Sequence, residues 1–182
     1  MSNHSLFRTI VQDMAFSAKK LNVKEKKLSI KTIFLMLISP EFRVVMSYRI
    51  NSYLYRAGFE RLSTVLYCFS KKKYSTDMHP KATIGVPFKV GHHMGIVIGP
   101  EVTIGNSCYF LNNVTFGNAS VGGQDVMPTV GDEVIVGVGA RILGGVSIGN
   151  GSIIGANSVV RSDIPAGEVW AGIPAKKIRC KL

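Results

Sequence analysis

A six-residue repeat runs through the second half of the chain and constrains its fold more than any other feature. An aliphatic or aromatic residue, usually followed by glycine, marks each unit: Ile84, Val90, Ile98, Ile104, Phe110, Phe116, Val130, Val136, Ile142, Ile148, Ile154 and Val160. Small or β-branched residues recur four positions later. This repeat is typical of a parallel β-helix, in which each unit forms a short strand and a turn and three units complete a triangular coil. The sequence therefore predicts a mainly β solenoid with the aliphatic residues stacked inside.

The repeat is interrupted twice, and each interruption predicts a segment outside the regular coil. The step from Val90 to Ile98 is eight residues, so two extra residues are extruded within 91–94. A later step of fourteen residues predicts a loop near 118–128. Insertions in repeat proteins map to loops that often form the binding face. Both segments are therefore candidate parts of a functional site.

The first half of the chain has a different period. From residue 28 to about 69, apolar residues recur at spacings of three and four, which predicts two or three short amphipathic helices, broken at Pro40 and Gly58. We therefore expect three parts: a basic α-helical N-terminal region (1–75), a β-helix domain (76–168) and a C-terminal tail (169–182).

Positive charge is concentrated in the predicted helices. The 182 residues include 22 Lys and Arg against 11 Asp and Glu, a formal charge of +11, and most of the basic residues lie within 8–73. This field favours anionic partners, such as acidic lipid headgroups, an acidic polysaccharide or a phosphorylated cofactor. Apolar helix faces flanked by basic residues indicate either peripheral membrane contact or packing on the rest of the protein. Nucleic acid is not favoured, because no recognised motif accompanies the charge.

Cysteine spacing and hydropathy favour a cytoplasmic protein. Cys68, Cys108 and Cys180 are widely spaced and form no Cys-x-x-Cys pair, so neither a disulfide framework nor a zinc site is expected. The longest apolar run, residues 32–39, is far shorter than the roughly twenty residues that a membrane-spanning helix needs. We expect no metal and a location in the cytoplasm, with the inner face of the membrane as a further option.

Five motifs occur in the order found in the hexapeptide-repeat acyltransferases. They are Asp77-Met-His-Pro, His92-His-Met-Gly-Ile-Val-Ile-Gly, the insertion ending at Pro128, Ile154-Gly-Ala-Asn-Ser-Val-Val and Ala171-Gly-Ile-Pro-Ala-Lys. The segment that carries them, about 105 of 182 residues, resembles this family, most closely its serine acetyltransferase branch and the related polysaccharide O-acetyltransferases. The resemblance implies a left-handed β-helix, acetyl-CoA as co-substrate, and a homotrimer with active sites between subunits.

The resemblance assigns the chemistry to two residues. His92 stands where the family has its general base, and Asp77, fifteen residues earlier, stands where the family has the residue that orients this base. A hydroxyl attacks a thioester only if its proton is removed as the bond forms, and a neutral imidazole near pH 7 suits that task. The oxygen of the acceptor is then the nucleophile. His93 is the competing candidate for the base. If it is not the base, we expect it to contact the acceptor at the rim of the site.

The resemblance also implies that the pantetheine arm runs along the outside of the coils, between two subunits. The positions similar to the family's cofactor contacts are Val138, Ala156, Arg161, Lys176 and Arg179. Small residues would admit the thin arm, and cations would meet the CoA phosphates. From the residues alone, the small residues are equally consistent with ordinary solenoid surface and the cations with a basic tail.

Three positions depart from the serine enzymes. In those enzymes an acidic residue precedes the catalytic histidine and an Arg-His pair precedes the proline of the loop, whereas this chain has Gly91, Val126 and Met127. An ammonium and a carboxylate would be left without partners. We therefore predict a neutral acceptor, a sugar hydroxyl in surface-polysaccharide biosynthesis, contacted by Gly91, His93 and Met127. Serine O-acetylation, as in cysteine biosynthesis, is the alternative.

Two interpretations come from other classes of protein. A non-catalytic β-helix assembly module would not need to break its repeat at a histidine. A metal-dependent β-helix hydratase would need three histidines on neighbouring coils, and the chain has none after His93. The sequence therefore favours an enzyme, an acyl-CoA-dependent O-acetyltransferase.

Overall fold

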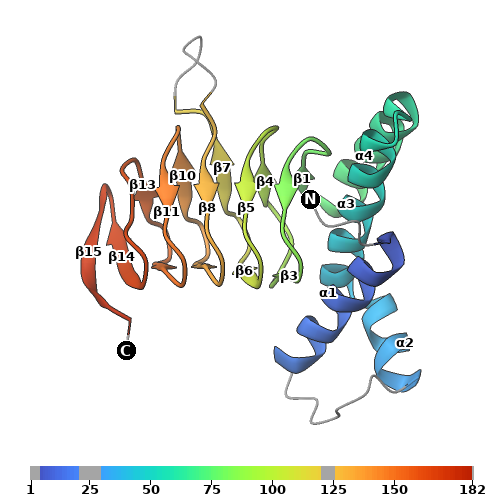
Figure 1. Cartoon of the computed structure of the whole chain (residues 1–182), viewed down its shortest axis with the longest axis horizontal. Helices are drawn as coiled ribbons and strands as arrows, with labels where there is room; N and C mark the ends of the chain where they lie inside the picture. Colours follow the sequence, from blue (N-terminus) through green and yellow to red (C-terminus); the bar gives the residue numbers. More distant parts are fainter. Residues whose placement is uncertain (1–4, 21–29, 120–125, 182) are drawn as a thin grey trace.

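A triangular solenoid of short strands carries a group of helices at its N-terminal end (Figure 1). The computed structural model describes residues 5–20, 30–119 and 126–181. The helices in these ranges are α1 (Leu6–Lys20), α2 (Ile30–Ile38), α3 (Pro40–Arg56) and α4 (Glu60–Tyr74). The helices predicted between residue 28 and about 69 are confirmed as α2, α3 and α4, and α1 adds a helix before them.

Local signals explain where the helices begin and end. Pro40 opens α3, where its missing N–H is one of the donors that have no partner within the helix. Gly58 lies just after α3 with a φ of +87°, a backbone conformation that glycine adopts readily. Both predicted breaks are therefore real boundaries.

The solenoid has three faces, each formed by a sheet of parallel strands, and one antiparallel strand, β15, is added at the edge of the third sheet. The first sheet contains β1 (Asp77–Met78), β4 (Val97–Ile98), β7 (Thr115–Gly117), β10 (Arg141–Leu143) and β13 (Val159–Val160). The second contains β2 (Thr83–Ile84), β5 (Thr103–Ile104), β8 (Thr129–Val130) and β11 (Ser147–Ile148). The third contains β3 (Phe88–Val90), β6 (Cys108–Phe110), β9 (Ile135–Val136), β12 (Ile153–Ile154), β14 (Glu168–Gly172) and β15 (Ala175–Cys180).

The interior confirms the six-residue repeat. All twelve periodic positions are between 0 and 6% exposed, and they form one continuous core. In-register pairing stacks each position on its counterpart one coil away, as for Ile98 and Phe116. Phe110 and Phe116 stack with their ring centroids 4.7 Å apart. The predicted β-helix is therefore correct.

Three edges join the sheets. The histidine edge joins the third sheet to the first, through residues 91–96, 111–114, 137–140 and 155–158. The loop edge joins the first sheet to the second, and its described turns include 99–102, 118–119, 126–128 and 144–146. The asparagine edge joins the second sheet to the third, through 85–87, 105–107, 131–134 and 149–152.

A buried ion pair attaches the helices to the first coil. Arg49 of α3 donates to Asp13 of α1, with a distance of 2.8 Å from Nε to Oδ2, and the two side chains are 7% and 1% exposed. The same guanidinium donates to the carbonyl oxygens of Ile84 and Gly85 at 2.6 and 2.7 Å. Asp13 in turn accepts a bond of 2.8 Å from the backbone N–H of Phe88. This ion pair therefore links α1 and α3 to the backbone of the first coil.

The C-terminal segment is part of the solenoid. β14 pairs in parallel with β12, and β15 then returns antiparallel to β14. Residues 169–181, expected as a tail, thus extend the third sheet beyond the last coil.

The outer face of the helices is partly apolar. Four large apolar side chains at α4 and its N-cap are 49–66% exposed: Phe59, Leu62, Val65 and Phe69. Three lysines at 71–73 follow them in the sequence. Within the described ranges, no helix is long and apolar enough to cross a membrane. Peripheral contact with a membrane stays a prediction.

Candidate functional site

His92 lies at the histidine edge of the first coil, two residues after the end of β3. Its backbone is left-handed, with a φ of +57°, and its side chain is exposed. The two-residue insertion thus turns the chain outward at this histidine. The side chain lines a cavity of about 210 Å³ between the first coil and the helices, together with Glu41, Phe42, Lys89 and Tyr109. An imidazole in such a cavity can exchange a proton with a bound hydroxyl.

His93 lies beside a carboxylate that the sequence analysis did not identify. Its Nδ1 is buried without a hydrogen-bond partner and lies 3.9 Å from Oε1 of Glu41. Burial acts to raise the pKa of Glu41, but its own backbone N–H, the Ser39 hydroxyl and the charges of His93 and His92 together hold that pKa below its ordinary value. Glu41 is therefore an anion at neutral pH, next to both histidines.

The sequence contained only an indirect signal for Glu41. It follows Pro40 in the first turn of α3, where acidic residues are common because they interact favourably with the helix dipole. Its separation of about fifty residues from His92 and His93 gives no local pattern, so only the docking of α3 on the first coil brings the three side chains together.

Asp77 begins the first coil in β1, and its carboxylate is held by α4. It accepts a hydrogen bond from the Tyr67 hydroxyl and one of 2.6 Å from Nζ of Lys71. Burial and the neighbouring carboxylate raise the pKa of Tyr67, so the phenol stays protonated and donates. In the described part of the chain, no hydrogen bond or ion pair links Asp77 to His92. Orientation of His92 by Asp77 stays a prediction.

Gly91 is buried next to Tyr109. A Cβ atom at position 91 would collide with the Tyr109 hydroxyl, so any side chain there would require the tyrosine to move. The absence of an acidic residue before His92 therefore fits the local packing.

Met127 and Val126 lie at a different edge from His92. Met127 packs against the core, with its sulfur near Gly99 at the loop edge. Val126 is 50% exposed and lies against Gly145 at the same edge. The predicted loop falls partly at 120–125, outside the described residues. Within one chain, Met127 and His92 are thus not part of one pocket.

Two of the predicted cofactor positions share the histidine edge with His92. Val138 and Ala156 lie on successive coils there, joined by a 2.8 Å bond from the N–H of Asn157 to the carbonyl oxygen of Val138. Val138 is half-buried and Ala156 is exposed. Arg161 is exposed just after β13, and Lys176 and Arg179 are exposed on β15. The structure therefore aligns the two small residues with His92, whereas the three cations lie towards the C-terminal end.

The three cysteine thiols differ in exposure. Burial raises the pKa of Cys108 to about 11, whereas Cys68 and Cys180 are exposed. All three thiols are free. The described residues contain no group of three or more His, Cys, Asp or Glu side chains arranged to hold a metal ion.

The chain is similar to a family model and to curated serine acetyltransferases. Residues 127–162 match a family model described as bacterial transferase hexapeptide (six repeats). The serine acetyltransferase of Buchnera aphidicola from Acyrthosiphon pisum is 34% identical over 177 residues, which is 97% of this chain and 63% of that protein. The serine acetyltransferase of Escherichia coli K12 is 36% identical over 135 residues, 74% of this chain and 50% of that protein. The chain thus spans about half to two thirds of the length of these curated relatives.

Solved structures extend the similarity to the helices. A truncated serine acetyltransferase apoenzyme superposes with a TM-score of 0.87 at 30% identity, covering 97% of this chain and 71% of its own. Soybean serine acetyltransferase complexed with serine gives 0.84 at 30% identity, with 96% and 70% covered. The Brucella abortus serine acetyltransferase in complex with coenzyme A gives 0.86 at 26% identity, with 97% and 68% covered.

Proposed function

Because the chain belongs to the serine acetyltransferase family of hexapeptide-repeat transferases, we propose that it is an acetyl-CoA-dependent O-acetyltransferase. The observation that carries the proposal is His92, an exposed imidazole that lines a cavity on the same edge as Val138 and Ala156. The coenzyme A complex of the Brucella abortus relative supports acetyl-CoA as the acyl donor.

His92 acts as the general base in the proposed reaction. The imidazole takes the proton of the acceptor hydroxyl while the hydroxyl oxygen attacks the thioester carbonyl. The C–S bond then breaks, and the imidazolium returns the proton to the CoA sulfur. Glu41 stabilises the imidazolium electrostatically, because its carboxylate interacts with His92 and His93. In this proposal Asp77 orients the base, as its position in the family motif implies.

L-serine is the acceptor that the relatives favour over our predicted sugar. The relatives named above are serine acetyltransferases, and the soybean structure contains serine. Gly91 cannot provide an anionic partner for an ammonium group. Glu41 can, because its carboxylate lines the His92 cavity. We therefore propose that Glu41 binds the amino group of serine. Glu41 lies in α3, whereas the acidic residue of the serine enzymes precedes the catalytic histidine.

A neutral sugar hydroxyl is the second candidate acceptor. Apolar side chains at Val126 and Met127 favour it, since they offer no charge to a serine carboxylate. The sugar acceptor could belong to a glycan intermediate bound to the membrane. The exposed apolar face of α4 would then contact the membrane surface.

A homotrimer would bring the separated site residues together. His92 and Met127 lie on different edges of one solenoid, so a site that uses both needs two copies of the chain. The same arrangement would cover the thin pantetheine arm between neighbouring solenoids. Closed rotational symmetry is the common way to form such repeated interfaces.

The acceptor is tested by measuring acetyl-CoA turnover by the purified full chain with L-serine and, separately, with a panel of neutral sugars. Loss of thioester absorbance is the preferred signal, because the exposed thiols of Cys68 and Cys180 would compete with CoA for a thiol reagent. Serine-dependent turnover supports the first candidate, and turnover with sugars alone supports the second. Absence of thioester loss with both L-serine and the sugars would favour a non-catalytic assembly module.

Glu41→Gln separates the two acceptors further. If Glu41 binds the ammonium group, the KM for serine rises about tenfold or more while the KM for acetyl-CoA is unchanged. Glu60→Gln is the matched control, since Glu60 is an exposed acidic residue in the first turn of α4. An unchanged KM for serine in the Glu41 variant would remove this residue from the acceptor site.

A further inference from the structure

Helix α4 carries an apolar stripe at the end of the molecule that is opposite to β14 and β15 (Figure 1). At 3.6 residues per turn, the exposed side chains of Leu62, Val65 and Phe69 fall within an arc of about 60°. Ser63 lies about 100° outside this arc, is buried, and donates to the carbonyl oxygen of Asn51 in α3 at 2.9 Å. The apolar stripe therefore points away from the face of α4 that packs on α3.

Basic side chains lie on both sides of the apolar stripe. By the same helical geometry, Arg61 and Lys72 lie along one margin and Lys73 lies along the other, and all three are exposed. Nζ of Lys73 is 5.8 Å from the ring centroid of Phe69, so this cation borders the stripe directly. Glu60, the acidic residue of α4, lies on the opposite side of the helix. The stripe is thus apolar along its centre and positively charged along its margins.

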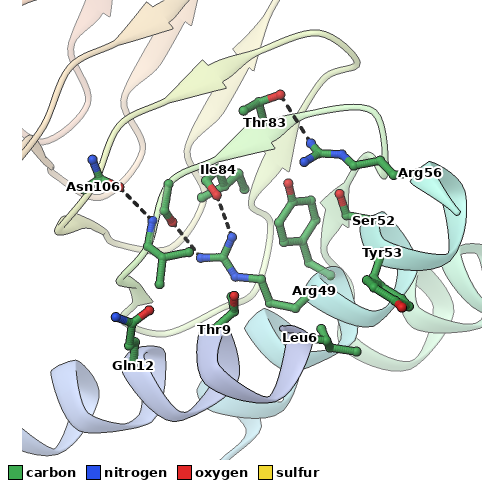
Figure 2. Close-up of a pocket in the computed structure, with 13 residues that line it drawn as sticks. Leu6, Thr9, Gln12, Arg49, Ser52, Tyr53, Arg56, Thr83, Ile84 and Asn106 are labelled. Atoms are coloured by element: carbon green, nitrogen blue, oxygen red, sulfur yellow. Dashed lines mark hydrogen bonds between the residues drawn. The ribbon is translucent and has the colours of Figure 1, made fainter. Parts of the chain in front are cut away.

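The support of the stripe is held by hydrogen bonds. Figure 2 shows Arg49 and Arg56 reaching from α3 to the first coil, where Arg56 donates to the Thr83 hydroxyl at 3.3 Å. α4 contacts the same coil through Lys71, whose Nζ lies 2.6 Å from Oδ2 of Asp77. These bonds fix the inner face of α4 on the protein and hold the stripe outward. A partner therefore meets a surface that is already formed, which lowers the entropic cost of binding.

The pattern of charge indicates which kind of partner fits the stripe. In a two-fold contact between two copies of the chain, the same patch meets itself, so the cations at the margins would face other cations. A nucleic acid would pair with the cations, but it offers phosphates and no apolar surface to the centre of the stripe. A bilayer with acidic lipids matches both parts, because apolar side chains enter the boundary between headgroups and acyl chains while cations meet the phosphates.

We propose that α4 binds in the plane of a bilayer surface that contains anionic lipids, with the apolar stripe inserted between lipids and the flanking cations at the phosphate groups. Long Lys and Arg side chains suit this position, because their stems cover apolar surface while their charges stay in water. The proposal goes beyond the acyl transfer at His92 and holds for either acceptor. It makes the chain a peripheral membrane protein that contacts lipid through its helices.

The experiment measures binding of the full chain to lipid vesicles by flotation. One set of vesicles contains phosphatidylcholine alone, and the other contains equal parts of phosphatidylcholine and phosphatidylglycerol. We expect at least tenfold stronger binding to the anionic vesicles, because each cation close to an anionic surface contributes about fivefold. Added salt should reduce the difference, since it screens the charges. No binding to the anionic vesicles, or equal binding to both sets, would overturn the proposal.

Two exposed thiols report which end of the molecule meets the vesicle. Cys68 lies in α4 and Cys180 lies at the end of β15. A polarity-sensitive fluorophore on Cys68, in the Cys180→Ser variant, should shift its emission to shorter wavelengths on anionic vesicles. The same fluorophore on Cys180, in the Cys68→Ser variant, should not shift. A shift at Cys180, or no shift at Cys68, contradicts the proposed orientation.

Two pairs of variants test the stripe and its margins. Phe69→Ser should weaken binding to anionic vesicles about tenfold or more, whereas Ile173→Ser, which removes an exposed apolar side chain between β14 and β15, should change nothing. Lys73→Glu should also weaken binding about tenfold or more, with Lys181→Glu at the end of the chain as the matched control. Circular dichroism checks that each variant is folded.

Undiminished vesicle binding by either α4 variant would contradict the proposed contacts. Light scattering of the chain without lipid tests the second copy as the partner. We expect Phe69→Ser to leave the molar mass in solution unchanged. A lower molar mass in this variant, together with no vesicle binding by the intact chain, would assign the stripe to contacts between copies and overturn the proposal.

Discussion

Replacing Arg49 tests how the helices are held on the solenoid. The Arg49→Leu substitution removes two bonds to Asp13 and the bonds to the Ile84 and Gly85 carbonyls. Of the bonds that Asp13 makes within the described ranges, this side chain, 1% exposed, would keep only the one from the Phe88 N–H. Breaking a buried ion pair by removing one partner typically costs about 3–5 kcal/mol, because an uncompensated charge remains. We expect a loss of this size in the free energy of unfolding at pH 7.

The loss should depend on pH. In the intact protein, burial raises the pKa of Asp13, and the Arg49 charge opposes that rise. Without Arg49 the pKa of Asp13 rises further, so the folded variant binds a proton more tightly than the unfolded chain does. Stability of the variant should therefore increase as pH falls from neutral towards the ordinary carboxyl range, and its deficit relative to the intact protein should shrink.

The assay is chemical unfolding of the full chain, followed by helical circular dichroism at pH 7 and at pH 5. Asp13→Asn combined with Arg49→Leu is the control, since asparagine can still accept from the Phe88 N–H without carrying a charge. The double variant should lose less stability than the sum of the two single variants, by about 0.5–3 kcal/mol. A deficit below about 1 kcal/mol for Arg49→Leu, or one that is independent of pH and additive with Asp13→Asn, would refute the reasoning.

Three further predictions follow from burial and exposure. His92→Gln should lower kcat by about 10²–10⁴-fold without lowering the melting temperature, since its side chain is exposed; near-normal turnover would transfer the role of base to His93. Phe110→Ala should lower the free energy of unfolding by about 3–5 kcal/mol, measured by denaturant titration, because the ring is fully buried, and a loss below about 1 kcal/mol would contradict the stacked core. A thiol reagent should titrate Cys68 and Cys180 in the native protein and Cys108 only after unfolding, because burial raises the pKa of Cys108 to about 11; three rapid equivalents would disprove this.

The position of His92 was predictable because the evidence for it is local. The repeat breaks between Val90 and Ile98, and an inserted pair of residues in a solenoid must turn outward. The structure confirms that His92 is exposed there and lines a cavity. The partners of Asp77 were not predictable in the same way, since Tyr67 and Lys71 depend on how α4 lies against the first coil.

The sequence by itself determined the β-helix, the helices between residue 28 and about 69, and the turn that carries His92. These features follow from short-range periodicity, because each coil repeats the environment of the one before it and the inward positions stack by necessity. Only the tertiary structure decided which side chains meet at the junction of helices and solenoid, such as Glu41 with His93 and Arg49 with Asp13. These residues are far apart in the chain, and their contacts depend on the docking angle of packed helices, which no local repeat encodes.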